Sequence, residues 1–470
     1  MWTGIILSLR QELMVIGILF LLLFIKVGAT EYKTGIILNL VNWLLLANFI
    51  LGLFAFPDST LFSGMFHTSR LIVLEKDMLN LATLIISLQG YSWLKDHRHV
   101  PEFYMLLLAT LVGFFFMISA GNLLMFYLGL ELSTIPLAAL SSFDLEKRRS
   151  SESGMKFILS SAFSSALLLF GISLLYGATG TLGFDTIAQR LDGSAFQLFA
   201  FILILSGFAF KVSAVPFHLW TADVYEGSPV TVTAYLSVVS KGAVFFIFIQ
   251  VLYTVFKPLA GNWYRILVLL SVLTMVIGNL FALRQDKLKR LLAFSSIAQS
   301  GFILAGITGS SRAGEASVIY FILVYIFSNL GAFGVVSLIS AQTGKENIDD
   351  YRGLYSTNPL LSWVMALSLF SLAGIPPLAG FFGKFFLLMA GAGKGNYVFI
   401  SIAALNMVIS LYYYLRVIKA IFMDTQPDPI RPLKIPLLPN IAFFVCMAGI
   451  IVTGFFGWIY DYIYSLSIGF

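Results

Sequence analysis

The chain has 470 residues, of which 59% are hydrophobic and 11% are charged. Soluble domains carry about a quarter charged residues, so this composition excludes a water-soluble globular protein and predicts a polytopic membrane protein. The net charge of +6 indicates basic cytoplasmic loops rather than a nucleic-acid partner. The single cysteine, Cys446, excludes an intrachain disulfide and a thiolate metal cluster. The sequence contains no P-loop and no convincing dinucleotide fingerprint, so we expect no NAD, ATP, flavin or iron–sulfur cluster in this chain itself.

Apolar stretches long enough to cross a membrane fill most of the chain, since a spanning helix needs about 20 mostly apolar residues. They predict an all-α fold with about fourteen transmembrane helices. In chain order the predicted segments are residues 11–27, 35–56, 72–94, 102–119, 122–142, 155–176, 197–217, 229–256, 263–283, 288–308, 314–341, 360–390, 397–421 and 437–464. Segment 3 opens with Glu75, Lys76 and Asp77, which we interpret as an interfacial cap.

The loops differ in charge between the two faces of the membrane. Seventeen Lys and Arg residues lie in loops that follow odd-numbered segments, against seven on the face that holds the N-terminus. Basic loops face the cytoplasm. With an even number of segments, both termini are therefore expected on the outer side.

Glu131 lies near the middle of segment 5, in NLLMFYLGLELSTIPLAAL. An unpaired, ionised carboxylate is costly there, so we expect it to be protonated or paired with a lysine. A structural ion pair that holds helices together is the alternative. Three intramembrane lysines elsewhere in the chain favour a functional role.

Segments 7 and 8 each carry a lysine inside an apolar run. Lys211 follows FAFILILSGFAF and precedes a break at Pro216, and Lys241 is followed by GAVFFIFIQVLYTVF. An ammonium group at the bilayer centre costs roughly 2.5–3.5 kcal/mol. A lysine that snorkels to the interface is the alternative, but both lysines lie near mid-segment, where snorkelling is ineffective. The pair predicts a buried polar path.

Segment 12 repeats this arrangement in SLAGIPPLAGFFGK, where two prolines precede Lys384. Burial and a neighbouring ammonium disfavour a charged lysine, whereas a nearby carboxylate favours it. A series of one glutamate and three lysines can therefore move protons by changing which neighbour is charged. This hypothesis assigns proton translocation to Glu131, Lys211, Lys241 and Lys384.

For other polar residues, at the ends of the segments, the sequence offers less support for a functional role. His218, two residues after Pro216, either shuttles protons between water and Lys211 or hydrogen-bonds the backbone carbonyls that the proline leaves free. Lys289 and Arg290 open segment 10 and are interpreted as anchors at the cytoplasmic surface. Glu152 and Lys156 fit a surface pair one helical turn apart.

The proline breaks in segments 7 and 12 are five segments apart. An odd offset means that the chain enters the two breaks from opposite faces, so a five-helix repeat here must be inverted. We expect three N-terminal helices in 1–100, a first repeat in 101–257, a second, inverted repeat in 258–422 and a C-terminal helix in 423–470. Broken helices at matching positions of inverted repeats point to a transport path.

Four motifs resemble the antiporter-like subunits of respiratory complex I, in the expected order over most of residues 100–420. They are FYLGLELSTIPL, KVSAVPFHLWTADVYEGSPVTVTAYLSVVSK, LKRLLAFSSIAQSG and SLAGIPPLAGFFGKF. Three features favour one subunit type of that family. They are the stretch at 156–181, Lys384, and the end at residue 470 without a long lateral helix. The resemblance implies that Glu131 pairs with Lys211 in one half-channel, that Lys241 connects, and that Lys384 serves the other half-channel. Some relatives carry a histidine where Gln299 stands, so a relay here must run by water.

The resemblance implies a proton-translocating subunit in the cytoplasmic membrane of a bacterium, driven by quinone reduction elsewhere in a complex. The implied partners are sibling antiporter-like subunits and small helical subunits, and NADH, flavin, iron–sulfur clusters and quinone belong to the complex as a whole. Alternatives are a multisubunit cation/proton antiporter, a related hydrogenase or formate-oxidising complex, and a structural scaffold. A sodium site would require further intramembrane carboxylates, and three buried lysines disfavour a scaffold.

Overall fold

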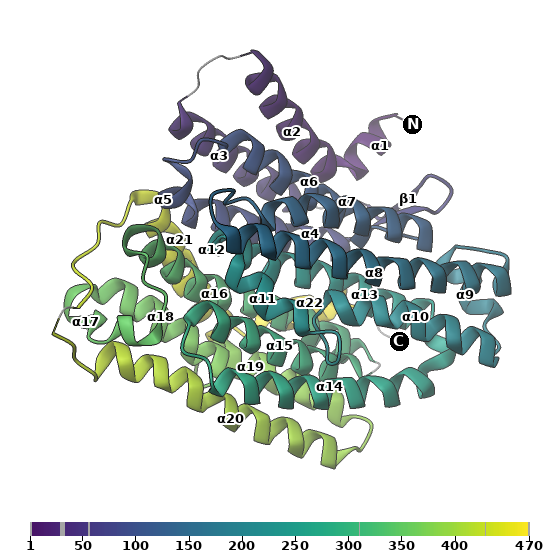
Figure 1. The fold of residues 1–470 in the computed structure, drawn as a ribbon. Coiled ribbons are helices and arrows are strands. Elements are labelled where there is room, and N and C mark those ends of the chain that lie inside the picture. The colour runs from purple at the N-terminus through teal and green to yellow at the C-terminus, as the bar shows by residue number, and fades with distance from the viewer. Residues whose placement is uncertain (1, 29–32, 55–56, 310, 428, 469–470) are drawn as a thin grey trace.

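The computed structural model describes residues 2–28, 33–54, 57–309, 311–427 and 429–468. It is built almost entirely of helices (Figure 1). Within the described ranges, the strands β1 (Ser59–Leu61) and β2 (Phe66–Thr68) form an antiparallel two-stranded sheet. The all-α polytopic fold predicted from composition is confirmed.

The helices follow the predicted segments in order. The N-terminal part contains α1 (Trp2–Ser8), α2 (Arg10–Gly28), α3 (Thr34–Gly52), α4 (Arg70–Gln89) and α5 (Tyr91–Leu94). The next part contains α6 (Val100–Ile118), α7 (Leu123–Ser141), α8 (Arg148–Thr179), α9 (Phe184–Arg190), α10 (Ala195–Lys211), α11 (Leu219–Gly227), α12 (Val230–Tyr235), the π-helix η1 (Leu236–Ser240), α13 (Lys241–Thr254) and the 3-10 helix η2 (Lys257–Leu259). The last part contains α14 (Ala260–Leu283), α15 (Leu288–Ile307), α16 (Arg312–Thr343), the 3-10 helix η3 (Ile348–Tyr351), α17 (Leu354–Thr357), α18 (Pro359–Ala373), α19 (Ala379–Ala392), α20 (Tyr397–Phe422), α21 (Leu437–Phe455) and α22 (Trp458–Leu466).

Eleven helices in the described ranges are long and apolar enough to cross a membrane. The charged α4, the shorter α10 and the broken pair α18 and α19 account for the other three predicted segments. The predicted break in segment 7 is confirmed, because α10 ends at Lys211 and α11 begins only at Leu219. Segment 12 is likewise interrupted, between Ala373 and Ala379.

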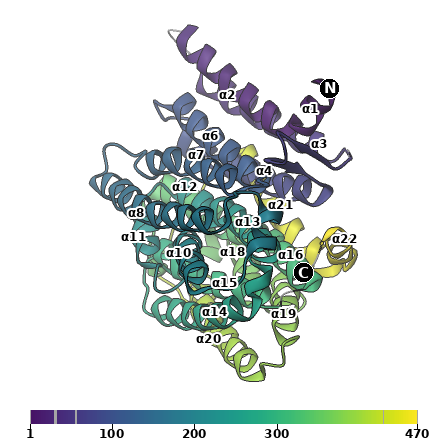
Figure 2. The same ribbon diagram turned by 90° about the vertical axis from the view of Figure 1, so that its right-hand side faces the viewer.

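The helices form a bundle whose centre contains α12, η1 and α13 together with α15 and α16. In Figure 1, α2 and α3 lie at one edge of the bundle and α20 lies at the opposite edge. Figure 2, turned by 90°, again places α14 and α20 far from α2. The spans that contain α13, α15 and α16 are almost completely buried, whereas α2, α20 and α21 bury about a third of theirs. The central helices therefore carry the residues that lipid does not reach.

The helices α8 and α16 occupy corresponding places in the two predicted repeats. Each has 32 residues, and each ends at a glycine in the left-handed region, Gly180 with φ 66° and Gly344 with φ 70°. Both positions favour glycine, because a Cβ atom is strained at such φ values. This correspondence supports a repeated five-helix unit.

The two breaks are built by the same backbone motif. After α10, Ser213 adopts φ 61° and the Ala214 amide donates to the Ala209 carbonyl at 2.8 Å. After α18, Gly374 adopts φ 86° and the Ile375 amide donates to the Phe370 carbonyl at 3.1 Å. A left-handed residue followed by this backbone bond is the Schellman ending of a helix. The prolines that follow prevent each helix from continuing.

The charges at the start of segment 3 are inside the protein. Lys76 donates to Glu12 of α2 at 2.5 Å, and both side chains are 1% exposed. Asp77 accepts from Gln11 at 2.6 Å, and Glu75 is buried as well. The interpretation of these three residues as an interfacial cap is therefore wrong, because α2 supplies polar partners that allow charged groups to be buried.

Glycines set the distance between the first two helices of each predicted repeat. A Cβ atom at Gly113 of α6 would lie 2.5 Å from the Ser133 amide nitrogen of α7. A Cβ atom at Gly278 of α14 would lie 2.7 Å from the Ala298 amide nitrogen of α15. Close backbone approach at small residues is a common means of packing helices in membranes.

We expect Gly278→Val to destabilise the protein by about 1–3 kcal/mol, because the added methyl groups would force α14 and α15 apart. The matched control is Gly177→Val, since a Cβ atom at Gly177 meets no heavy atom within 4 Å. The measurement is the thermal unfolding midpoint of each variant in detergent-solubilised membranes. Equal midpoints for the two variants would contradict the close packing described here.

Candidate functional site

Lys211 is the last residue of α10, and its ammonium group points into the protein. It donates to the hydroxyl of Thr134 on α7 at 2.7 Å and to the hydroxyl of Ser161 on α8 at 2.8 Å. The side chain is only 8% exposed. Three helices of the first predicted repeat thus meet at this lysine.

Glu131 lies on α7 one helical turn before Thr134, and residues three apart share a helix face. Its carboxylate acts electrostatically on the Lys211 ammonium. No ion pair within 4.0 Å joins the two groups in the described ranges, and the Oε1 atom of Glu131 has no hydrogen-bond partner there. The structure thus places Glu131 near Lys211, but hydroxyl groups rather than the carboxylate contact the ammonium.

Lys241 opens α13 directly after the π-helical turn η1. Its ammonium donates to the Ser296 hydroxyl of α15 at 2.6 Å and lies 5.7 Å from the centre of the Tyr225 ring. A ring within about 6 Å attracts a cation through its electron-rich face. Short π-helical turns are frequent at functional sites, because they redirect one side chain relative to the helix on either side.

Buried polar side chains continue beyond Lys241 toward α16. The Ser237 hydroxyl lies 3.0 Å from the Tyr325 hydroxyl and accepts from the Asn329 amide at 2.6 Å. The three side chains are at most 6% exposed.

Lys384 of α19 binds the carbonyl groups that the second break leaves free. Its ammonium donates to the Leu372 carbonyl at 2.7 Å and to the Ala373 carbonyl at 3.4 Å, and it lies 4.9 Å from the centre of the Phe302 ring. The side chain is fully buried. The helix break therefore supplies the acceptors that a buried ammonium group requires.

Gln299 of α15 connects the surroundings of Lys241 and Lys384. Its amide donates to the Leu372 carbonyl at 3.1 Å and to the Tyr414 hydroxyl at 3.2 Å, so Leu372 accepts from both Gln299 and Lys384. On its other side, Gln299 and Lys241 line one cavity of about 10 Å³. This volume is about the smallest that holds a water molecule.

His218 lies in the break between α10 and α11 and is 7% exposed. Its imidazole lies beside the Pro216 carbonyl. Lys211 donates to Thr134 and Ser161 rather than to His218. The structure therefore supports neither of the two interpretations of His218 over the other.

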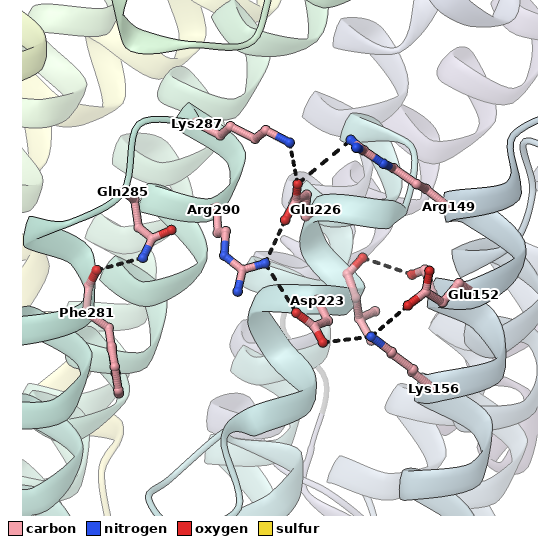
Figure 3. A network of polar contacts seen from close by, with 11 residues as sticks. Arg149, Glu152, Lys156, Asp223, Glu226, Phe281, Gln285, Lys287 and Arg290 are labelled. Carbon is pink, nitrogen blue, oxygen red and sulfur yellow. Dashed lines mark hydrogen bonds and ion pairs between the residues drawn. The ribbon is translucent and has the colours of Figure 1, made fainter.

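Seven charged residues form an ionic cluster at the ends of α8, α11 and α15 (Figure 3). They are Arg149, Glu152, Lys156, Asp223, Glu226, Lys287 and Arg290. Asp223 contacts Lys156 at 2.8 Å and Arg290 at 3.2 Å. Lys156 also contacts Glu152 at 2.8 Å, which confirms the predicted surface pair. The cluster lines most of a cavity of about 220 Å³.

Glu226 is the residue of this cluster with the most cationic neighbours. Burial alone would raise the pKa of Glu226, but hydrogen bonds from Lys287 at 2.6 Å and Arg290 at 2.7 Å hold that pKa below its ordinary value. The carboxylate is therefore charged at neutral pH, and it ties α11 to the start of α15.

The two residues that open segment 10 differ in exposure. The Arg290 side chain is 33% exposed, as expected for a surface anchor. Lys289 is only 5% exposed and donates to the Ser228 carbonyl at 2.9 Å. Its interpretation as a surface anchor is wrong, because the buried ammonium group is held by the Ser228 carbonyl and lies 3.7 Å from Glu346.

The sequence did not identify the hydroxyl partners of the lysines. Thr134 is recognisable only by its position one turn after Glu131, and Ser161 and Ser296 lie in long helices among many other serines. The described ranges contain no group of three or more His, Cys, Asp or Glu side chains that could hold a metal ion.

The chain is similar to known membrane subunits over most of its length. The family described as NADH:quinone oxidoreductase/Mrp antiporter, TM, matches residues 120–410. NADH-quinone oxidoreductase subunit N of Phocaeicola vulgatus is 49% identical over 415 residues, which are 87% of this chain and 88% of that protein. Subunit N of Moorella thermoacetica is 42% identical over 81% of each chain. Residues 156–181 and Lys384 favour one subunit type of the family, and the names of these relatives identify that type as subunit N.

Solved structures give the same picture of the fold. A chain of respiratory complex I from Thermus thermophilus with bound aureothin has a TM-score of 0.81 and 27% identity, over 98% of this chain and 100% of that chain. A chain of the Mrp complex from Dietzia sp. has a TM-score of 0.88 over 98% and 97%, but its 20% identity shows the fold alone. The chain belongs to the NADH:quinone oxidoreductase/Mrp antiporter family of membrane subunits.

Proposed function

We propose that this chain is a proton-translocating membrane subunit of NADH:quinone oxidoreductase, in which quinone reduction elsewhere in the complex drives proton transfer through this chain. The observation that carries the proposal is the set of three buried lysines, each of which donates to a neutral oxygen atom. The names of the relatives favour this complex over an antiporter or a hydrogenase.

In the first repeat, Lys211 and Glu131 are the proposed proton-carrying groups. Thr134 and Ser161 can accept a hydrogen bond from the ammonium and donate one to the neutral amine, because a hydroxyl does both. Either protonation state of Lys211 therefore keeps its partners. A charged Glu131 stabilises the ammonium form, and protonation of Glu131 removes that stabilisation.

Between the repeats, the proposed relay runs from Lys241 to Lys384 past Gln299. Glutamine cannot change its charge, so the proton would cross by a water molecule in the small cavity that Lys241 and Gln299 line. The Leu372 carbonyl holds Gln299 and Lys384 in fixed positions on the far side. His218 is retained as a candidate shuttle between water and Lys211.

The proposed arrangement in the membrane follows the charges of the loops. The basic loops face the cytoplasm and both termini lie on the outer side of a bacterial cytoplasmic membrane. Residues 1–100 form the N-terminal helices, 101–257 and 258–422 the two inverted repeats, and 423–470 the C-terminal part. The shared length and ending of α8 and α16 support this division.

We expect Lys211→Ala to lower both NADH:quinone activity and proton pumping to about a tenth or less in the intact membrane, because a group that transfers protons contributes at least that factor. Assembly is checked by native gel. The matched control is Lys394→Ala, which removes an exposed lysine outside the buried series.

If Lys211→Ala assembles and pumps like the control, the buried lysine carries no coupled proton transfer and the proposal fails. Copurification of this chain with antiporter or hydrogenase partners, in place of NADH-oxidising ones, would also refute it.

We expect Gln299→Leu to slow pumping by about tenfold, because leucine cannot orient water beside Lys241 or bind the Leu372 carbonyl. Gln299→His keeps a hydrogen-bond donor and an acceptor at the same place. We expect this variant to keep roughly half or more of the pumping of the unaltered protein. The readout is the number of protons moved per NADH oxidised in membrane vesicles. Equal ratios for Gln299→Leu and the unaltered protein would remove Gln299 from the relay.

A further inference from the structure

The helix α16 carries two neighbouring polar residues that the proposed relay does not use. Ser328 is 1% exposed and Asn329 is 0% exposed, and both lie near the middle of this helix. Successive residues of an α-helix point about 100° apart, so the two side chains reach different neighbours. The neighbours are η1 and α18, and α16 packs against both.

Asn329 holds the π-helical turn η1, which leads directly to Lys241. Its amide nitrogen donates to the Ser237 hydroxyl of η1 at 2.6 Å. The hydroxyl of Tyr325, one turn earlier on α16, lies 3.0 Å from the same Ser237 hydroxyl. Two side chains of α16 therefore fix the position of the turn that precedes Lys241.

The other polar atom of the Asn329 side chain supports this role. Its Oδ1 atom is buried and has no hydrogen-bond partner in the described ranges. A buried polar atom without a partner is costly, and an apolar side chain of similar size would avoid that cost. The hydrogen bond to Ser237 is therefore the feature that accounts for an amide at this place.

Ser328 holds the second helix break from the same helix. Its hydroxyl is hydrogen-bonded to the Ser371 hydroxyl of α18 at 2.7 Å. Ser371 also accepts from the backbone amide of Gly380 in α19 at 3.1 Å, so one hydroxyl joins the two sides of the break. The next residue, Leu372, supplies the carbonyl that binds the Lys384 ammonium at 2.7 Å. Ser328 thus fixes the segment on which Lys384 depends.

The helices α16 and α18 approach each other closely beside this hydrogen bond. A Cβ atom at Gly331 of α16 would lie 2.2 Å from the Ser368 hydroxyl oxygen of α18. Gly331 is three residues after Ser328 and Ser368 is three residues before Ser371, so each shares a helix face with a bonded serine. The close approach therefore keeps the bond between Ser328 and Ser371 in a fixed geometry.

We propose that Ser328 and Asn329 are positioning residues, which make α16 a spacer that fixes Lys241 and Lys384 relative to each other. Asn329 acts on Lys241 through Ser237, and Ser328 acts on Lys384 through Ser371. In the described ranges neither side chain is hydrogen-bonded to a lysine, so both act only through the groups that they hold. This inference rests on the proposed function, in which protons pass between the two lysines.

A fixed separation matters because proton transfer depends steeply on distance. The cavity beside Lys241 and Gln299 has room for about one water molecule, so the gap between the lysines leaves little tolerance. A displacement of about 1 Å can lower the rate of a transfer step by about a hundredfold. Because α16 holds both ends of the gap, one helix sets its length.

The test measures the rate of proton pumping in inverted membrane vesicles that contain the whole complex, with assembly checked by native gel. We expect Asn329→Leu and Ser328→Ala each to slow pumping by about tenfold, because each change releases the segment that places one lysine. If Asn329→Leu does not assemble, Ser237→Ala breaks the same hydrogen bond from the other side and is measured in its place.

Each variant has a matched control. Asn48→Leu is the control for the amide, because Asn48 on α3 is also 0% exposed, donates to Asn80 at 3.1 Å and has an Oδ1 atom without a partner in the described ranges. Ser317→Ala is the control for the hydroxyl, because the Ser317 hydroxyl donates to the Gly314 carbonyl of its own helix at 2.8 Å. Both controls should pump like the unaltered protein. Equal pumping in each variant and its control would refute the positioning role.

A double variant separates positioning through Ser237 from a general structural role. Asn329→Leu combined with Ser237→Ala should pump no slower than the slower single variant, because both changes break one hydrogen bond. Ser237→Thr keeps the hydroxyl and should keep roughly half or more of the pumping. If the two single effects multiply in the double variant, or if Ser237→Thr pumps as slowly as Ser237→Ala, Asn329 does not act through this hydroxyl and the inference is refuted.

Lys211→Ala, measured in the same vesicles, separates this inference from the proposed function. Reduced pumping in Lys211→Ala, with normal pumping in Asn329→Leu and Ser328→Ala, would refute the positioning role alone. Normal pumping in all three variants would refute the proposed function and the positioning role together.

Discussion

The structure depends on the need to give each buried ammonium group an oxygen acceptor inside the protein, away from bulk water. Thr134 and Ser161 meet this need for Lys211, Ser296 meets it for Lys241, and backbone carbonyls meet it for Lys384. An uncompensated charge would cost several kcal/mol. The helices α7 and α8 bring acceptors to Lys211, α15 brings one to Lys241, and the second helix break brings two to Lys384.

The sequence was sufficient for the fold class, the order of the segments and the two breaks. Long apolar runs, mid-span prolines and isolated charges are local features, and each can be read without knowledge of what packs against it. The partners could not be read in this way. Lys76 and Glu12 are 64 residues apart, so nothing local to segment 3 distinguishes a buried pair from an interfacial charge. The prediction of Lys289 as a surface anchor was wrong for the same reason, because the exposure of its side chain depends on Ser228 and the chain around it.

The two helix breaks share one backbone arrangement but differ in side-chain chemistry. Both breaks end a helix with a left-handed residue and the same hydrogen bond, yet Lys211 precedes its break and Lys384 follows its own. As a result, Lys211 depends on hydroxyl groups of α7 and α8, whereas Lys384 depends on the carbonyls that the break itself exposes. The first site therefore responds to substitutions in neighbouring helices, and the second responds to changes in the backbone of its own segment.

The small cavity between Lys241 and Gln299 has a consequence for energy conservation. A continuous column of water from one face to the other would conduct protons down the gradient, and each charge that returns across 100 mV wastes about 2.3 kcal/mol. The cavity has room for about one water molecule. In the proposed relay, protons would not pass between Lys241 and Gln299 when that molecule is absent or wrongly oriented. In the proposed relay, this tight packing would limit leakage of the stored gradient between turnovers.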